Sequence, residues 1–294
     1  WKFSNKKTKV GMSNSAILSS SIAKKYWMAL TGLFLCLFLV GHLLGNLQLI
    51  FITGDEGKLA FNEYAYFMTH NPLIKVMSWL TYLSIIFHAV DGILLTIQNK
   101  KARPIPYAHN NPSANSSFPS RNMALLGSLI LIFIATHMAN FWWKMKIKED
   151  VPLHTYKLEM DNPMMGAANA ELYYTHVPGI QPIPKDGKNI VEKGTDLYIK
   201  GTNVKVAEGY RDLHGLVMDF FNKSKNEGAL FAVLFYVISM IVLGYHLLHG
   251  FQSAFQSLGI NHPKYTPLIK IIGTGFAVIV PLLFAIIPII IYNL

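Results

Sequence analysis

Cysteine is almost missing from this sequence. Cys36 is the single cysteine among 294 residues and lies inside a long apolar run, so the chain forms no internal disulfide. No nucleophile, acid–base dyad or flavin motif stands out, which argues against substrate chemistry carried out by this chain alone. Carboxylates are equally scarce in the apolar runs, where Asp91 is the one that we place inside a helix. A proton path built from buried carboxylates is therefore not expected.

A basic patch with interleaved aromatic residues is also missing, although the net charge is +10, and nucleic acid is therefore not an expected partner. The basic residues stand at the ends of apolar runs, as in multi-pass membrane proteins. Three such groups belong on one side, which should be cytoplasmic. The N-terminus is then cytoplasmic, and five crossings put the C-terminus outside. These groups are Lys2, Lys6, Lys7, Lys9, Lys24 and Lys25, then Lys100, Lys101, Arg103 and Arg121, then Lys264.

Five long apolar blocks dominate what is present. A membrane-spanning helix needs about 20 apolar residues, and each block reaches that length. The sequence therefore predicts an all-α membrane protein with three helices in 1–146, an insertion at 147–227 and two helices in 228–294. Asn71 before Pro72 predicts a capped start for the second helix. The expected spans are 24–53, 73–98, 122–146, 228–256 and 268–291.

The insertion at 147–227 differs in kind, because it is polar and rich in proline and glycine. We expect short strands and turns outside the membrane, on the extracytoplasmic side, followed by an amphipathic helix around Leu213 to Phe221. Its histidines, His154, His176 and His214, are too dispersed to suggest a metal site and are expected at the surface.

Four of the five predicted helices carry a histidine at depth, where an ionisable group indicates function by default. His42 follows Lys25 by 17 residues, about 26 Å, and His137 follows Arg121 by 16, about 24 Å. Both belong in the outer half. His88 precedes Lys100 by 12 residues, about 18 Å, which puts it nearer the inner face. His249 belongs at that same level, because it precedes Lys264 by 15 residues that include a turn.

The histidines therefore pair by depth, His42 with His137 outside and His88 with His249 inside. Two imidazoles that face each other across a helix bundle are what a six-coordinate haem iron needs. His246, three residues before His249, is the alternative ligand. We prefer His249 for its depth and because Gly250 follows it. Side chains that could orient the imidazoles are Asn46, Thr136 and Asn140.

Two other interpretations of the histidines stay open. Each could hydrogen-bond a neighbouring helix, as polar residues in membrane bundles do, and Gly41 with Gly45 could serve helix packing. A transporter is the corresponding alternative function, although five helices do not divide into two matching halves.

Four motifs carry a resemblance: three contain proposed ligands, and one precedes the second helix, which carries His88. They are KYWMALTGLFLCLFLVGHLLGNL (25–47), THNPLIK (69–75), THMANFWW (136–143) and HLLHGFQSAFQSLGINHPKYTP (246–267). They resemble the di-haem cytochrome b subunit of succinate dehydrogenase and fumarate reductase, in the five-helix, menaquinone-linked form of Bacteroidetes-type bacteria. The resemblance covers nearly all of the membrane portion, whereas 147–227 is longer than the connection expected there.

The resemblance implies a membrane anchor with two haem b groups in the bacterial inner membrane. It would dock a flavoprotein and an iron–sulfur subunit on the cytoplasmic face and pass electrons between them and menaquinone. Succinate chemistry would reside in those partners. The implied iron ligands are His42, His88, His137 and His249. An anchor for another respiratory dehydrogenase would share this ligation, and the direction of the reaction is left open.

The quinone site is expected toward the outer haem, which points to the first outer loop. Glu63 would be its proton acceptor, with Asn62, Tyr64 and His70 nearby. Asp91, three residues from His88, could serve helix capping or a structural hydrogen bond as well as proton relay. Basic residues proposed for the haem propionates on the inner side are Lys101, Arg103 and Arg121.

Overall fold

The structure, a computed structural model, describes residues 20–105, 111–160, 168–176 and 183–294. Five of its helices are long and apolar enough to cross a membrane. The lysines at positions 2, 6, 7 and 9, on which part of the orientation argument depends, lie outside the described residues. The five helices are α2 (Ser21–Phe51), α4 (Pro72–Ala102), α7 (Met123–His137) with its continuation, α9 (Ala229–Ser257) and α10 (Thr266–Asn293).

The predicted spans agree closely with these helices, and the largest difference is at the end of the second, expected at 98 and found at Ala102. The start of α4 follows the prediction: Asn71 Oδ1 accepts hydrogen bonds from the backbone N–H groups of Leu73 (2.9 Å) and Ile74 (3.3 Å), and Pro72 occupies the first turn. The third span is less regular than expected. After His137 it continues as two π-helical segments, η1 (Met138–Trp142) and η2 (Lys144–Lys148), and such segments recur at functional sites.

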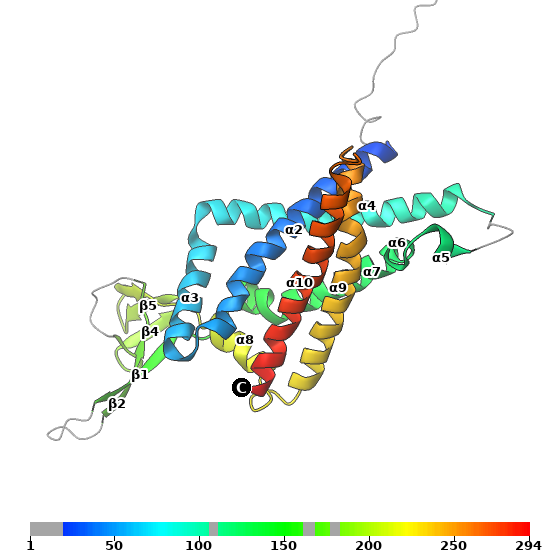
Figure 1. The fold of residues 1–294 in the computed structure, drawn as a ribbon. Coiled ribbons are helices and arrows are strands. Elements are labelled where there is room, and N and C mark those ends of the chain that lie inside the picture. Colours follow the sequence, from blue (N-terminus) through cyan, green and yellow to red (C-terminus); the bar gives the residue numbers. More distant parts are fainter. Residues whose placement is uncertain (1–19, 106–110, 161–167, 177–182) are drawn as a thin grey trace, which may run out of the picture.

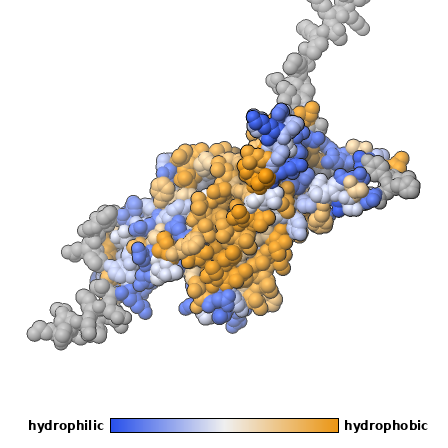
Figure 2. Space-filling model, in the orientation of Figure 1, coloured by the Kyte–Doolittle hydropathy of each residue, from blue (hydrophilic) through white to orange (hydrophobic). Residues whose placement is uncertain are grey.

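Helices α2, α9 and α10 lie side by side, and α4 and α7 run at an angle to them (Figure 1). The main core forms where α2, α9 and α10 meet the short helix α8 (Leu213–Phe221). Pro281 and Pro288 stand inside α10 and are buried, and the helix continues through both. On the outside, large apolar side chains of α9 and α10 form a broad hydrophobic surface with hydrophilic regions at its two ends (Figure 2).

The first outer loop is largely helical, which the sequence analysis did not predict. Helix α3 (Gly54–His70) joins α2 to α4 and buries Gly57, Phe61 and Asn62. The connection between α4 and α7 contains the short helices α5 (Pro112–Asn115) and α6 (Phe118–Arg121) without buried residues, as expected of a surface segment.

The insertion contains the predicted short strands. They form two three-stranded antiparallel sheets. The two sheets share a small core, in which Leu197 is completely buried and packs with Leu153 and Tyr173. Helix α8 follows at the predicted residues. The first sheet contains β1 (Thr155–Met160), β2 (Ala168–Tyr173) and β3 (Ile183–Pro184), and the second contains β4 (Ile190–Lys193), β5 (Asp196–Ile199) and β6 (Lys205–Glu208).

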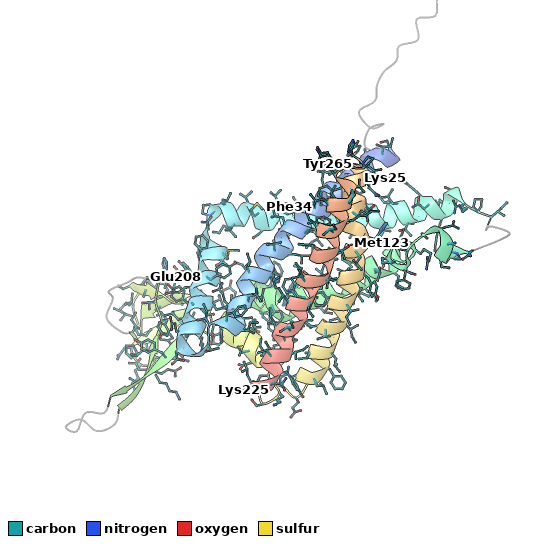
Figure 3. All side chains as sticks on the ribbon, viewed as in Figure 1. Lys25, Phe34, Met123, Glu208, Lys225 and Tyr265 are labelled. Atoms are coloured by element: carbon teal, nitrogen blue, oxygen red, sulfur yellow. The ribbon has the colours of Figure 1, made fainter. Side chains whose placement is uncertain are left out.

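The helix bundle has two distinct ends. Lys25 at the start of α2 and Tyr265 before α10 lie together, and Met123 at the start of α7 lies toward the same end (Figure 3). Glu208 of the insertion and Lys225, between α8 and α9, lie toward the other (Figure 3). We call these the far end and the insertion end. Lys25 is thus at the far end, and three other basic residues used for the orientation prediction are close in sequence to the residues labelled there: Lys24 precedes Lys25, Lys264 precedes Tyr265, and Arg121 stands two positions before Met123.

Candidate functional site

The structure brings His42 of α2 and His137 of α7 together at the insertion end. Their ring centres are 5.8 Å apart and the ring planes are nearly perpendicular, at 85°. The pair is enclosed by aromatic rings, because His42 stacks on Phe38 (5.3 Å) and His137 is 5.3 Å from Phe141. This is the pairing that the depth argument predicts.

The second pair lies toward the far end and differs in one member from the preferred assignment. His88 of α4 faces His246 of α9, with ring centres 6.1 Å apart and planes at 70°. His249 has no ring contact or hydrogen bond among the described residues. The structure therefore favours His246, the alternative. Depth could not separate the two residues, since they are about 4.5 Å apart along the axis, and the rotation of α9 decides which of them faces His88.

Glycines make room at the far-end pair. A Cβ atom on Gly32 of α2 would lie 3.1 Å from His88 Cε1, and one on Gly127 of α7 would lie 3.8 Å from His246 Cε1. A Cβ atom on Gly250 would lie 4.0 Å from His246 Cδ2, so the glycine that favoured His249 in the sequence lies beside His246. At the far-end pair, α4 and α9 thus supply the histidines, and α2 and α7 each supply a glycine beside them.

The two pairs are separated by the same spacing on two helices, α2 and α7. Ten positions divide Gly32 from His42 on α2, and ten divide Gly127 from His137 on α7. Ten positions on a helix are about 15 Å along its axis. The structure therefore has two histidine levels about 15 Å apart. The two helices that supply the histidines of one level run in the same direction, opposite to the two that supply the other level.

The Nδ1 atoms of these histidines have different surroundings. His42 Nδ1 is 3.4 Å from Asn46 Nδ2, and His88 Nδ1 is 3.3 Å from the hydroxyl of Thr31, a buried residue. His246 Nδ1 is buried and has no hydrogen-bond partner among the described residues. Asn46 therefore lies where the sequence analysis expects an orienting group, whereas Thr31 was missed because a threonine in an apolar helix gives no distinctive signal.

At His137, the predicted orienting side chains are arranged differently. Asn140 Nδ2 donates to the hydroxyl of Tyr236 (3.4 Å), and that hydroxyl is 3.4 Å from His137 Nδ1. Thr136 is exposed, and its hydroxyl donates to carbonyl oxygens of its own helix, at Ile132 and Phe133. Thr136 thus does not orient His137 in the structure. The side chain next to His137 Nδ1 is instead Tyr236 of α9.

A group of polar residues fastens the insertion to α3. Asn62, only 1% exposed, donates to Asp212 Oδ1 (3.0 Å) and accepts from the backbone N–H of His214 (2.9 Å). Lys58 Nζ is 2.6 Å from the other oxygen of Asp212. Burial would raise the pKa of Asp212, but hydrogen bonds from Lys58, Gly215 N–H and Asn62 outweigh it, and the pKa lies below its ordinary value. Asn62 therefore has a structural role.

Among the three histidines of the insertion, His176 is exposed as expected, His214 is half-buried and His154 is buried. His154 is 1% exposed, in contradiction to the surface position predicted for it, and its Nδ1 lacks a hydrogen-bond partner among the described residues. Burial lowers its pKa to about 4, and burial lowers the pKa of His214 in the same way. Both imidazoles are therefore neutral at physiological pH.

Glu63 lies on the side of α3 that faces away from the histidine pairs. It is exposed and turned by about 160° around the helix axis from Phe61, which packs in the main core with Leu43 of α2. Tyr64 is the residue of this segment that approaches α2: a Cβ on Gly45 would lie 2.8 Å from its ring. Proximity to His42 thus favours Tyr64 over Glu63.

Glu63 instead lines an open groove of about 510 Å³ between α3 and the insertion. In this groove the ring of Tyr66 is flanked by His70, with centres 3.8 Å apart, and by His176 of the insertion, at 4.3 Å. His70 Nε2 is 3.6 Å from Glu208 Oε1. His70, which the sequence analysis placed near the quinone, therefore connects α3 to the insertion.

The donor set restricts the kind of metal centre that the histidine pairs could form. Among the described residues, no group of three or more His, Cys, Asp and Glu side chains could hold an ion by itself. Two facing imidazoles suit a metal whose remaining ligands come from a macrocycle. A metal–imidazole bond is about 2 Å long, so two imidazoles on opposite sides of one iron have ring centres about 6 Å apart. Both pairs have that separation.

Comparisons of the chain with protein-family models, with curated proteins and with solved structures find no match.

Proposed function

We propose that this chain is the membrane-anchor cytochrome b of a succinate:quinone oxidoreductase, with two haem b groups that connect an iron–sulfur subunit to menaquinone. One observation carries the proposal: two pairs of facing imidazoles, about 15 Å apart, within five helices that can cross a membrane. His42 with His137 and His88 with His246 would hold the two irons. When bound, haem supplies one-electron transfer.

The chain's own contribution is to hold and separate the two centres. Helices α2, α4, α7 and α9 each give one imidazole, and Gly32 and Gly127 keep space beside the far-end pair. Aromatic and aliphatic side chains around the insertion-end pair exclude water, which restricts proton exchange there. The sequence-based preference for His249 is replaced by His246 in this proposal, because His246 faces His88.

In the proposed orientation, the far end is cytoplasmic and the insertion is extracytoplasmic, in the inner membrane of a bacterium. The basic residues at the far end support this through the positive-inside rule, and that end would dock the flavoprotein and iron–sulfur subunits. Menaquinone would bind toward the insertion-end pair. Of the residues suggested there, Tyr64 is nearest to α2, whereas Glu63 would act only if the quinone entered the groove beyond α3.

The first test combines the reduced-minus-oxidised visible spectrum with pyridine-haem quantitation of the purified chain. We expect two haem b groups per chain in the wild type, loss of one in His42→Ala, loss of the other in His246→Ala and retention of both in His249→Ala. The matched substitutions at 246 and 249 differ by less than one turn of the same helix. Loss of haem in His249→Ala alone would restore the sequence-based ligand. A wild-type protein without haem would overturn the proposal and favour a transporter.

A second experiment addresses the partners. The chain is purified gently from its own membrane, and the proteins that accompany it are identified. A flavoprotein and an iron–sulfur subunit with succinate:quinone activity are expected. If the chain contains haem but is purified with a different dehydrogenase, the assignment as a cytochrome b is kept and the proposed partner enzyme is wrong.

A further inference from the structure

Tyr236 is a buried residue whose hydroxyl contacts the insertion-end histidine pair. It is 7% exposed, and its ring centre lies 4.9 Å from that of Phe221 and 5.0 Å from that of Phe133. In this aromatic surrounding, the polar neighbours of its hydroxyl among the described residues are His137 Nδ1 and Asn140 Nδ2, each at 3.4 Å. Buried hydroxyl groups in proteins are nearly always hydrogen-bonded, so these two contacts account for its place.

The position of Tyr236 along α9 fits the spacing of the two levels. It precedes His246 by ten residues, the same interval that divides Gly32 from His42 and Gly127 from His137. Helix α9 therefore gives a ligand at the far-end level and a phenol at the insertion-end level. Ten residues are about 15 Å, so the phenol reaches the level of His137 without a bend in α9.

We infer that Tyr236, supported by Asn140, is a positioning residue for His137. The inference rests on the proposed function. An imidazole that binds iron through Nε2 carries its proton on Nδ1, and a phenol oxygen can accept that proton in a hydrogen bond. Such a bond fixes the ring orientation and the tautomer of the ligand and makes the ligand a stronger electron donor. Asn140 would donate to the same oxygen and hold it in place.

In the described part of the chain, no phenol contacts the far-end pair. His88 Nδ1 is next to Thr31, an aliphatic hydroxyl, and His246 Nδ1 is buried without a partner among the described residues. The two centres thus differ in the hydrogen bonds to their ligands. Removal of the Tyr236 hydroxyl should therefore change the insertion-end centre alone.

The experiment is a redox titration of the purified protein in wild-type, Tyr236→Phe, Asn140→Ala and Tyr82→Phe forms. Tyr236→Phe removes the hydroxyl and keeps the ring in its aromatic surroundings. We expect both haems to be retained, the midpoint potential of the centre that is lost in His42→Ala to rise, and the other potential to stay unchanged. A smaller rise is expected for Asn140→Ala. Tyr82→Phe is the matched control, because the Tyr82 hydroxyl accepts from Trp142 Nε1 (2.9 Å) and contacts no histidine among the residues that the structure describes.

Unchanged potentials in Tyr236→Phe, with both haems present, would overturn the inference and leave the proposed function intact. A shift confined to the other centre, or an equal shift in Tyr82→Phe, would also overturn it. Should Tyr236→Phe fail to accumulate, Asn140→Ala decides by the same criterion. A wild-type protein without haem would remove the proposed function and this inference together.

Discussion

Replacement of Asn62 by alanine should release the insertion from α3. The change removes the hydrogen bond to the Asp212 carboxylate and leaves the backbone N–H of His214 buried without an acceptor. A hydrogen bond to a charged group contributes about 1.5–3 kcal/mol, and an unsatisfied buried donor costs about 1–3 kcal/mol. Because the two contacts share one network and do not add fully, we expect a loss of about 3 kcal/mol in the stability of this interface.

The assay is hydrogen exchange of the purified protein, followed by mass spectrometry. Peptides that cover α8 and β6 should lose protection by about 100-fold, since 1.4 kcal/mol corresponds to a factor of about ten. Peptides from α9 and α10 should keep their protection, because those helices pack against each other independently of α3. Global unfolding is thereby distinguished from release of the insertion.

Glu63→Ala is the matched control. It changes the neighbouring residue of the same helix, which is exposed and makes no hydrogen bond among the described residues, so its effect should stay within about 0.5 kcal/mol. Protection of α8 in Asn62→Ala within threefold of the wild type would refute the reasoning. An equal loss in the control would do so too, because it would assign the effect to α3 as a whole.

Acid should open the same interface, and alanine at one glycine should disturb one histidine pair. Burial lowers the pKa of His154 to about 4, so its contribution to stability is complete above the ordinary pKa of about 6.5 and is lost as the pH falls toward 4. The loss reaches about 3 kcal/mol. His154→Phe, whose ring can still pack on Tyr174, should flatten the decrease of α8 protection factors over this range; an unchanged decrease would contradict the assignment. Gly32→Ala should alter the spectrum and potential of the centre at His88, whereas Gly41→Ala, which meets nothing within 4 Å, should not. Equal spectra for the two alanine variants would show that contact with Gly32 is unimportant.

Hydropathy was sufficient to predict the five long helices because a membrane-spanning helix needs about 20 consecutive, predominantly apolar residues, and a run of that length is visible in the sequence. The start of α4 could be predicted as well, since Asn71 and Pro72 act locally and need no tertiary partner. Histidine pairing by depth was a longer argument, and it succeeded for His42 with His137. It preferred His249, whereas His246 faces His88, because depth depends on counting residues and facing depends on the rotation of the helix.

Helix α3 was missed for a different reason. It packs against α2 through Phe61 and Tyr64 and against the insertion through Asn62, so polar and apolar residues are buried on adjoining faces. A segment buried by two different partners does not show the single apolar stripe by which a surface helix is recognised. The partner that explains Asn62 is Asp212, 150 positions away in sequence.

Tyr236 could have been found from the sequence by its spacing. On each of three helices, an interval of ten residues joins a residue at one histidine level to a residue at the other level. The interval identifies Tyr236 as a residue of the insertion-end level, but it does not show that this tyrosine faces a histidine. That contact depends on α7 and its π-helical continuation, which turn His137 and Asn140 toward the same residue of α9, Tyr236. A widened helical turn leaves no sequence signal comparable to a proline or a cap.

The insertion is structurally continuous with the candidate site, and this changes how a deletion should be designed. Helix α8 belongs to the segment 147–227, yet its Phe220 and Phe221 pack on Tyr236, with ring centres 6.0 and 4.9 Å away, and through that residue they adjoin His137. Removal of the whole segment would therefore expose the insertion-end pair as well as remove the sheets. A deletion limited to the strands, 155–208, leaves α8 in place and keeps the attachment of Asp212 to Asn62. Only the shorter deletion can separate a binding role of the sheets from the support that α8 gives to the histidine pair.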